Sequence, residues 1–389
     1  MENSKNCVVY MGMMFPAEII RHFALFARAE KKLMDEAGVD FYFAAVKTET
    51  KQNAWPIVYE AFPKERIIDE STYTGIVSRI ESLFETYNRV VLHFQGGWSM
   101  LKPLCPLKKR FKDRFSIIAV TQYYRNDGWL RIPMSIFQYF VYSKYVDLVN
   151  FQSPFSVRKF VGGQKLYQAG KGTVIPMGCE AFPEVRKEAP ESLRMAGIAS
   201  LLEDTSIFKF VYLAAFRAGK RHEWLVRAVA EELKKHPDVR MLFCGQGSKE
   251  CIDGVKDAIR QLDVSGQVIL PGQIPHEDLP WLLAHCNCAI IPSVSETFGH
   301  AFVEPMMAGL PILGTRVGAG EYVIRDYETG ISFELGAPLT LRRGFRVLVE
   351  NRKATKQMGE TARRLAEIMF SFEEVAKMWA GIYLEMLGR

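Results

Sequence analysis

Short apolar runs alternate with longer segments of helical periodicity along this chain, and this alternation restricts the fold more than any other feature. In the first half the runs are NCVVYMG, DFYFAAV, RVVLHFQ, SIIAVTQ and DLVNFQ, with helical segments such as 17–38 between them. Strands that alternate with helices form parallel sheets covered by helices on both faces. The pattern therefore predicts an α/β fold.

A second series of the same kind follows a segment rich in Gly, Pro and charge, KGTVIPMGCEAFPEVRKEAPE, which contains the short strand TVIP. Its strand candidates are FKFVYLAAF, VRMLFCG, QVILPG, CAIIPSV and PILGTR, and its helical candidates include HEWLVRAVAEELKKH and VKDAIRQL. A length of 389 residues also favours two domains. We predict two doubly wound domains, 1–180 and 190–371, with a linker near 179–190 and a terminal helix at about 372–389.

Composition excludes several classes of protein. The net charge of +6 is small for a nucleic-acid-binding protein, so no nucleic-acid partner is expected. Seven scattered cysteines without a CxxC pair favour a reducing, cytoplasmic location over a disulfide framework or a zinc site. The longest apolar stretch, 132–142, is far shorter than the ~20 residues that a membrane-spanning helix needs, and no secretory signal is recognisable.

The segment CAIIPSVSETFGHAFVEPMMAGLPILGT carries the strongest chemical signal. An apolar strand ends at Ser293, a turn contains Gly299, and a helix follows that is closed by Gly309. Ligands of parallel α/β sheets bind at the carboxyl ends of strands, and a helix N-terminus there attracts an anion. We therefore expect a phosphate at the turn formed by Phe298, Gly299 and His300.

Glu296 and Glu304 flank this turn, eight positions apart. A carboxylate accepts two hydrogen bonds side by side, which suits the vicinal hydroxyls of a ribose or a hexose. The pair indicates a sugar on each side of a phosphate. The alternative is that both are solvated acids, or that Glu296 only caps the helix.

The whole segment from SETFGHAFVE to DYETG resembles the Glu-x7-Glu signature of the family 4 retaining glycosyltransferases. The resemblance is close from about 208 to 380, including VILPGQIPHEDLPWLLAHCNCAIIPS and the FCGQG loop, and covers the first half only in outline. It implies the GT-B fold, in which two Rossmann-like domains face one another across a cleft and the last helix crosses back to the first domain. It further implies a nucleotide-diphospho-sugar donor as co-substrate, with no other cofactor, and an acceptor hydroxyl held by the first domain.

Positive charge for the diphosphate is expected in the turn of LAAFRAGKRHEWLV. By resemblance, Lys220 is the lysine of the pair that grips the diphosphate. The commonest spacing in the family would place the arginine of that pair at Ala215, but a frequent variant places it at Arg217, which we favour. The alternative for the cluster is a solvated basic turn.

Other contacts are implied on loops that follow strands. Gly245 in FCGQG, and Gln273 with Ile274 in PGQIP, are expected at the nucleotide, the latter two through their backbone. In the first half, Gly12 follows the first strand where relatives have a glycine loop, here reduced to one glycine; a plain turn is the alternative. Tyr123 stands where relatives often carry a histidine near the donor sugar. His93 lies on the preceding strand, as a cleft or core residue.

The resemblance implies a retaining glycosyltransferase, and we expect it to work without a metal ion because no Asp-x-Asp motif occurs and the basic turn can replace a cation. Lys220, Arg217 and Glu296 are the expected catalytic residues, with Glu296 holding the donor sugar. The alternatives are another GT-B enzyme, such as an epimerase or an inverting transferase, and a non-catalytic subunit that binds nucleotide-sugar. A dehydrogenase is disfavoured because no GxGxxG motif follows the first strand.

The basic stretch 102–114 raises the separate hypothesis of peripheral membrane contact. It carries six cationic side chains against the single acid Asp113, and the aromatic and aliphatic segment 128–145 follows it. Such a cluster can hold a protein at an anionic bilayer that presents a lipid-linked acceptor. The alternative is a solvated helix face beside a buried helix.

Overall fold

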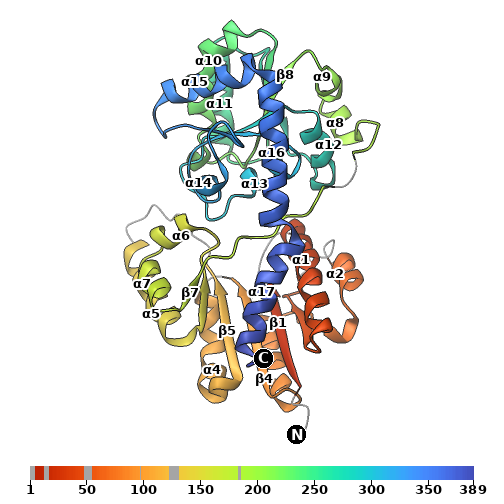
Figure 1. Ribbon diagram of the computed structural model, residues 1–389, viewed down its shortest axis with the longest axis vertical. Coiled ribbons are helices and arrows are strands. Elements are labelled where there is room, and N and C mark those ends of the chain that lie inside the picture. The colour runs from red at the N-terminus through yellow and green to blue at the C-terminus, as the bar shows by residue number, and fades with distance from the viewer. Residues whose placement is uncertain (1–4, 13–16, 48–54, 97, 122–130, 183–184) are drawn as a thin grey trace. The chain divides into compact units, whose positions relative to one another are not determined.

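The computed structural model describes residues 5–12, 17–47, 55–96, 98–121, 131–182 and 185–389 (Figure 1). The chain divides into two compact units. The first comprises Met1–Glu180 and Phe370–Arg389, and the second comprises Ala181–Met369. The last segment of the chain thus belongs to the first unit.

The first unit contains a seven-stranded, fully parallel sheet with the order β3-β2-β1-β4-β5-β6-β7. The chain builds the sheet outward in one direction from β1, then returns and builds it in the other direction from β4, as in a doubly wound fold. The strands are β1 (Asn6–Gly12), β2 (Asp40–Ala44), β3 (Ile67–Ile68), β4 (Arg89–Gln95), β5 (Phe115–Val120), β6 (Leu148–Asn150) and β7 (Gly172–Thr173).

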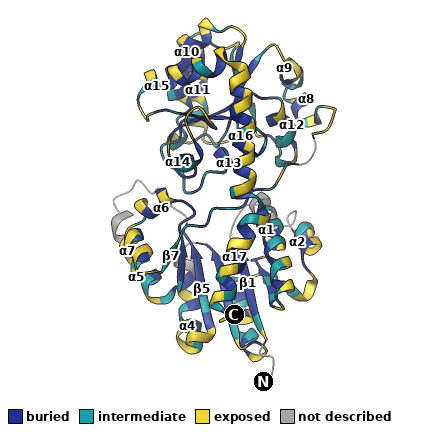
Figure 2. Ribbon diagram, in the orientation of Figure 1, coloured by how far each residue is buried: buried dark blue, intermediate teal, exposed yellow. Residues whose placement is uncertain are grey.

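Helices cover both faces of this sheet. They are α1 (Ala17–Glu36), α2 (Trp55–Ala61), α3 (Tyr73–Ser82), α4 (Cys105–Phe111), α5 (Arg131–Tyr145), α6 (Pro154–Lys159), α7 (Gly163–Gln168) and the C-terminal α17 (Phe372–Met386). The strands are buried on both sides, whereas the helices are buried along one face (Figure 2). This explains the nearly continuous apolar strands in the sequence, because parallel strands covered on both faces have no solvated side.

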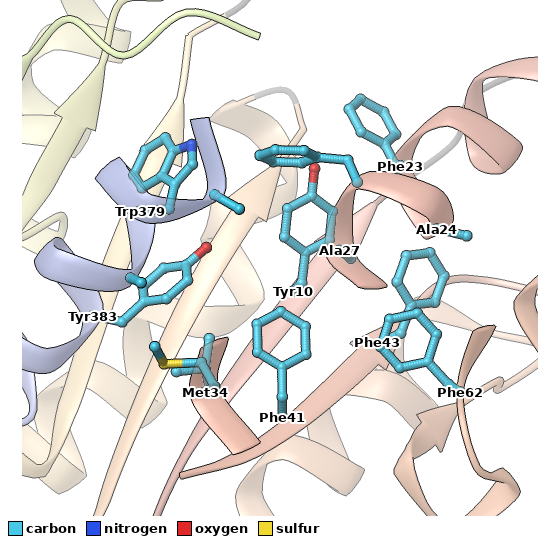
Figure 3. Close-up of a cluster of buried hydrophobic side chains, with 14 of the residues drawn as sticks. Tyr10, Phe23, Ala24, Ala27, Met34, Phe41, Phe43, Phe62, Trp379 and Tyr383 are labelled. Carbon is cyan, nitrogen blue, oxygen red and sulfur yellow. The ribbon is translucent and has the colours of Figure 1, made fainter. Parts of the chain in front are cut away.

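The C-terminal helix α17 completes one face of the first core. Trp379 and Tyr383 of α17 lie across from Tyr10 of β1, in a cluster that also contains Phe23 and Phe41 (Figure 3). Trp379 is 2% exposed and Tyr383 is fully buried. A core aromatic residue contributes several kcal/mol, so the first unit depends on a segment that is remote in sequence.

The second unit repeats the topology with a six-stranded parallel sheet of order β10-β9-β8-β11-β12-β13. Its strands are β8 (Phe208–Leu213), β9 (Val239–Cys244), β10 (Val268–Gly272), β11 (Cys288–Ile291), β12 (Ile312–Gly314) and β13 (Gly330–Ser332). Its helices are α8 (Glu191–Met195), α9 (Ala199–Glu203), α10 (His222–Lys235), α11 (Lys249–Gln261), α12 (Leu279–Ala284), α13 (His300–Met307), α14 (Gly320–Val323), α15 (Pro338–Glu350) and α16 (Arg352–Phe370). The prediction of two doubly wound α/β units is confirmed.

Two elements differ from the sequence-based boundaries for local reasons. The short strand predicted at TVIP ends at Thr173 because the Asn150 side chain takes over the hydrogen bonds of Ile175, accepting from its N–H at 2.8 Å and donating to its carbonyl at 2.9 Å. Helix α11 begins at Lys249, earlier than periodicity indicates, because the Ser248 hydroxyl accepts a hydrogen bond from the Cys251 N–H.

Candidate functional site

The candidate site lies where the strand order of the second sheet reverses. β8 and β11 are neighbours, yet the chain leaves β8 toward one edge of the sheet and leaves β11 toward the other. The loops after the two strands therefore diverge and leave a crevice at their carboxyl ends, which is the usual ligand position in open α/β sheets. Lys220 follows β8 and Glu296 follows β11, so both predicted residues lie at this reversal.

The structure brings Lys220 and Glu296 together as an ion pair between Nζ and Oε1. Both side chains are partly buried, with exposed fractions of 23% and 12%. The Tyr212 hydroxyl ties the same two loops together, lying 3.0 Å from the Lys220 carbonyl and 3.1 Å from the Ser293 hydroxyl. A cation and a carboxylate are thus held side by side, facing the carboxyl edge of the sheet.

The turn that carries Glu296 is supported by a second loop through glycine. Gly318 has φ of +55°, and a Cβ there would lie 2.3 Å from the Phe298 carbonyl oxygen. This close approach lets the Ala319 N–H donate to the Phe298 carbonyl at 2.6 Å. No residue with a side chain could replace Gly318 without moving the turn.

Helix α13 begins directly at the turn, with Gly299 as its N-cap in a left-handed conformation. Burial lowers the pKa of His300, the first helical residue, to about 4, so its imidazole is neutral at pH 7. Burial also raises the pKa of the Glu304 carboxyl, one turn later, to about 7. The site therefore combines the positive end of a helix dipole with a carboxyl that titrates near neutrality.

A pocket of about 290 Å³ opens beside the same edge of the sheet. It contains three of the residues that the sequence pointed to, Gly245, Gln273 and Ile274, together with Leu213, Ala214, Ala215, Cys244, Gln246 and Leu279. Gly245, with φ of +156°, is required here because a Cβ would lie 2.2 Å from the Ala214 carbonyl oxygen. The volume is near the lower end of the range for small-molecule sites, ~300–1,000 Å³.

Sequence reasoning missed several of these residues, although a signal was present. Ala214, Ala215 and Gln246 follow β8 and β9 directly, and the carboxyl ends of parallel strands share one edge of a sheet. Their position after the strands would have been enough to predict that these three residues line the site. The contacts of Tyr212 had no such signal, because a strand tyrosine is ordinarily a core residue.

Other predicted site residues are not joined to this cluster. Arg217 lies on the same loop as Lys220 and is exposed, with no ion pair among the described residues. Gly12 is the last residue of β1, in the first unit, and a Cβ there would meet only ordinary contacts, the nearest at 3.6 Å. Tyr123 lies outside the described residues. His93 is fully buried in the first unit, in contact with α17.

The basic stretch 102–114 is partly used inside the first unit. Lys108 is paired with Asp147 at 2.8 Å, Arg110 forms an ion pair with Glu81, and Arg114 donates to three backbone carbonyls. These side chains stabilise the loops around α4. Lys102, Lys109 and Lys112 remain exposed.

Two features are absent from the described part of the chain. No described helix combines the length and the apolar character needed to cross a membrane. No group of three or more His, Cys, Asp or Glu side chains within the described ranges is arranged to hold a metal ion.

Comparison with known proteins adds independent findings. Residues 198–365 match the family model for glycosyl transferases group 1, a range that contains the ion pair, α13 and the pocket. N-acetyl-alpha-D-glucosaminyl L-malate synthase of Bacillus anthracis is 27% identical over 177 residues, which are 46% of this chain and 45% of that protein. The chain thus matches less than half the length of this curated relative.

Solved structures match over almost the whole chain. The Alr3699/HepE protein of Anabaena in complex with UDP-glucose superposes with a TM-score of 0.73, over 97% of this chain and 99% of that chain, at 15% identity. A glycosyltransferase from Rickettsia africae superposes with a TM-score of 0.74, over 98% and 99% of the two chains, at 17% identity. The fold is therefore GT-B.

Proposed function

We propose that the protein transfers a glycosyl unit from a nucleotide-diphospho-sugar to a hydroxyl acceptor, with retention of configuration and without a metal ion. The observation that carries the proposal is the Lys220–Glu296 ion pair at the strand reversal, beside the N-terminus of α13 and the 290 Å³ pocket. The group 1 glycosyl transferase model matches this unit, and the Anabaena neighbour was solved with UDP-glucose.

Each part of a nucleotide-sugar has a partner in this arrangement. The pocket at Gly245, Gln273 and Ile274 is assigned to the base, and the Glu304 carboxyl to the ribose hydroxyls. The diphosphate is assigned to Lys220, Arg217 and the first N–H groups of α13, since unpaired backbone donors and the helix dipole favour an anion. Glu296 is then left for the hydroxyls of the donor sugar.

Catalysis is assigned to charge stabilisation. As the bond between the sugar and the diphosphate breaks, negative charge grows on the leaving group, and fixed positive groups stabilise that charge more than they stabilise the ground state. Lys220 is oriented for this task by its carboxylate partner. In a transfer with retention, the acceptor hydroxyl attacks the anomeric carbon of the donor sugar from the same face as the departing diphosphate. The departing phosphate takes up the proton of the acceptor hydroxyl.

We also propose that the first unit contacts an anionic membrane surface through Lys102, Lys109 and Lys112, together with α5. Ile136, Phe137 and Phe140 of α5 are 42%, 53% and 61% exposed, and their spacing groups these three large apolar side chains on one side of the helix. Lys109 lies over the ring of Tyr145 at the end of α5. The exposed apolar and cationic side chains are therefore on neighbouring elements.

The proposed activity is tested with nucleoside diphosphates and nucleotide-sugars. A nucleoside diphosphate or nucleotide-sugar that binds the folded protein and not the unfolded chain should raise the melting temperature. At 100 times its dissociation constant, such a ligand adds about 2.7 kcal/mol of stability. Slow hydrolysis of the bound donor, or transfer to a hydroxyl compound, should then be detectable by release of the nucleotide. NMR of the product anomer separates retention from inversion. Binding without any turnover would favour the non-catalytic alternative.

A further inference from the structure

Tyr212 of β8 is fixed in position by the aromatic side chains around it. It is fully buried, and its ring packs against His222 of α10 with 4.6 Å between the ring centroids. Phe243 of β9 meets the same ring in a T-shaped arrangement at 6.3 Å. His222 is held in turn by Phe216, whose ring stacks on it at 4.2 Å. The phenol hydroxyl therefore has a defined position near the carboxyl end of β8.

This hydroxyl joins the loop after β8 to the loop after β11. Burial raises the pKa of Tyr212, so the phenol is protonated at pH 7 and can donate. It donates to the Lys220 carbonyl at 3.0 Å, and its oxygen can then accept from the Ser293 hydroxyl at 3.1 Å. The Val294 N–H donates to the Gly219 carbonyl at 3.0 Å. The carbonyls of two consecutive residues, the second of them Lys220, are therefore both bound.

The residue after Lys220 has an unfavourable backbone conformation. Arg221 lies in the left-handed region, with φ of +54° and ψ of +36°, which costs energy for a residue other than glycine. The peptide group between Lys220 and Arg221 carries the carbonyl that Tyr212 binds. Because a peptide group is planar, turning this carbonyl away from Tyr212 would change ψ of Lys220 and φ of Arg221 together. The hydrogen bond from Tyr212 therefore opposes the relaxation of Arg221 to a negative φ.

The conformation of Arg221 determines where Lys220 lies. Arg221 is the single residue between the 3₁₀ turn Ala218–Lys220 and α10, which begins at His222. Its φ and ψ therefore set the direction in which the turn meets the helix. Relaxation to a negative φ would move the turn, and the Lys220 ammonium group would leave its ion pair with Glu296.

We propose that Tyr212 is a positioning residue, which holds the Lys220 ammonium group at the diphosphate site by fixing the peptide group between Lys220 and Arg221. Tyr212 does not touch the donor in this role and acts only through Lys220. The assignment of the diphosphate to Lys220 rests on the function proposed above. The effect of Tyr212 on the conformation of the turn does not depend on that assignment.

Isothermal titration of the full chain with UDP tests this role. If Tyr212→Phe leaves the required conformation one-tenth populated, the apparent dissociation constant of UDP rises about ten-fold. In the Lys220→Ala background the same substitution should change UDP affinity by less than about two-fold, because Tyr212 acts only through Lys220. Thr355→Val is the matched control. It removes another buried hydroxyl of the second unit, which donates to the Leu348 carbonyl at 2.8 Å, and should leave UDP affinity unchanged.

Arg221→Gly provides a rescue that a packing role of Tyr212 does not predict. Glycine adopts a positive φ without a steric cost, so the peptide group should keep its direction without the hydroxyl. The variant with both Tyr212→Phe and Arg221→Gly should therefore bind UDP as well as Arg221→Gly alone. If Tyr212→Phe does not fold, Arg221→Gly should restore folding.

Three results would overturn the positioning role. The first is unchanged UDP affinity in Tyr212→Phe. The second is an equal loss of affinity with and without Lys220. The third is a failure of Arg221→Gly to restore the affinity, or the folding, that Tyr212→Phe removes. The second and third results would show that Tyr212 supports the site by packing alone.

Hydrogen exchange at the Arg221 amide needs no ligand and separates this inference from the proposed function. Lys-Arg occurs twice in the sequence, at 109–110 and 220–221, so ¹³C-carbonyl lysine with ¹⁵N-arginine labels two peptide groups. Exchange at Arg221 should be about ten-fold faster in Tyr212→Phe, with exchange at Arg110 unchanged. Faster exchange without any binding of UDP to wild type would support the positioning role and count against the transferase. Binding of UDP to wild type, with Arg221 exchange unchanged in the variant, would do the reverse.

Discussion

Lys220 and Glu296, 76 positions apart in the chain, form an ion pair across the strand reversal of the second sheet. Each residue follows one of the two strands at which the winding of the sheet changes direction, so the topology itself brings them together. In a partly buried pair, each partner offsets the desolvation of the other. Removing the charge of Lys220 and removing the charge of Glu296 should therefore have different effects on nucleotide binding and on turnover.

Lys220→Ala should reduce turnover by about 100-fold or more. Its ammonium group is assigned to the charge that develops on the leaving diphosphate, and preorganised groups of this kind contribute at that scale. The measurement is kcat with the nucleotide-sugar that the binding experiments identify. Lys256→Ala, an exposed lysine of α11 in the same unit, is the control and should keep wild-type turnover. A near-normal kcat for Lys220→Ala would remove Lys220 from the mechanism.

Glu296→Gln should separate binding from catalysis. The amide keeps hydrogen bonds to a sugar but no longer neutralises Lys220, so a nucleoside diphosphate should bind several-fold more tightly. Turnover should fall, because Glu296 is assigned to the donor sugar. Isothermal titration with UDP and steady-state kinetics measure the two effects. Weaker UDP binding would show that Glu296 supports the site only by keeping it folded.

Glu304 should make nucleotide binding depend on pH. Its pKa is raised to about 7, and the ionised carboxylate accepts hydrogen bonds from ribose hydroxyls better than the neutral acid does. Affinity for uridine, which has no phosphate that titrates nearby, should therefore increase as the pH rises from 6 to 8. Glu304→Gln should bind more weakly, with a flat profile. The same slope in the variant would assign the pH dependence to another group.

The same carboxyl should reduce the stability of the free protein at high pH. A folded pKa of about 7 exceeds the ordinary value of 4.5, so the folded state binds more protons between these values. Stability therefore falls as the pH rises from about 4.5 to 7, by an amount on the order of 1–3 kcal/mol. Glu304→Gln should raise the melting temperature above pH 7 and leave it nearly unchanged below pH 5.

The sequence predicted local features of the molecule better than contacts between distant residues. The strand β4 and the start of α10 match their predicted ranges, because apolar runs and helical periodicity are local properties. The residues Glu296 and Lys220 were recognisable from the family resemblance, but their ion pair was not, since it depends on the adjacency of β8 and β11. Strand order is a non-local property and no spacing of residues encodes it directly.

The buried contacts of His93 show what the sequence does not predict. His93 was noted only as a lone histidine on a strand, and Glu30 lies in the helical segment 17–38 without any motif. The contact that joins them is made by Tyr383, 290 positions from His93. Periodicity predicts that the last segment is a helix but not which surface it covers, so the contact between Tyr383 and His93 could not be predicted from the sequence.

Turnover should persist in excess EDTA. The diphosphate is assigned to Lys220, Arg217 and the N-terminus of α13, which together supply positive charge without a bound cation. The assay compares donor turnover before and after chelation, then after addition of magnesium or manganese. Loss of activity on chelation with recovery on adding either ion would refute the metal-free proposal.

Binding to anionic vesicles should depend on the exposed lysines beside α5. Each Lys or Arg near an anionic surface contributes about 1 kcal/mol, so changing Lys102, Lys109 and Lys112 to Ala should weaken binding about 100-fold. Lys108 is left intact because its ion pair with Asp147 holds α4 in place. The control changes three exposed lysines of the second unit, Lys234, Lys256 and Lys356, which removes the same total charge.

Co-sedimentation with phosphatidylserine-containing vesicles measures this binding, and phosphatidylcholine vesicles provide the neutral surface. Wild-type protein should sediment with the anionic vesicles only, and less so as salt is raised. Phe137→Ser with Phe140→Ser should also weaken binding, because these exposed rings can insert between lipid headgroups. If the two triple lysine-to-alanine variants sediment equally weakly with the anionic vesicles, the net charge of the protein determines its attraction to the membrane. The surface at α5 then has no special role. Equal recovery from anionic and neutral vesicles would indicate an acceptor that is not presented by a membrane.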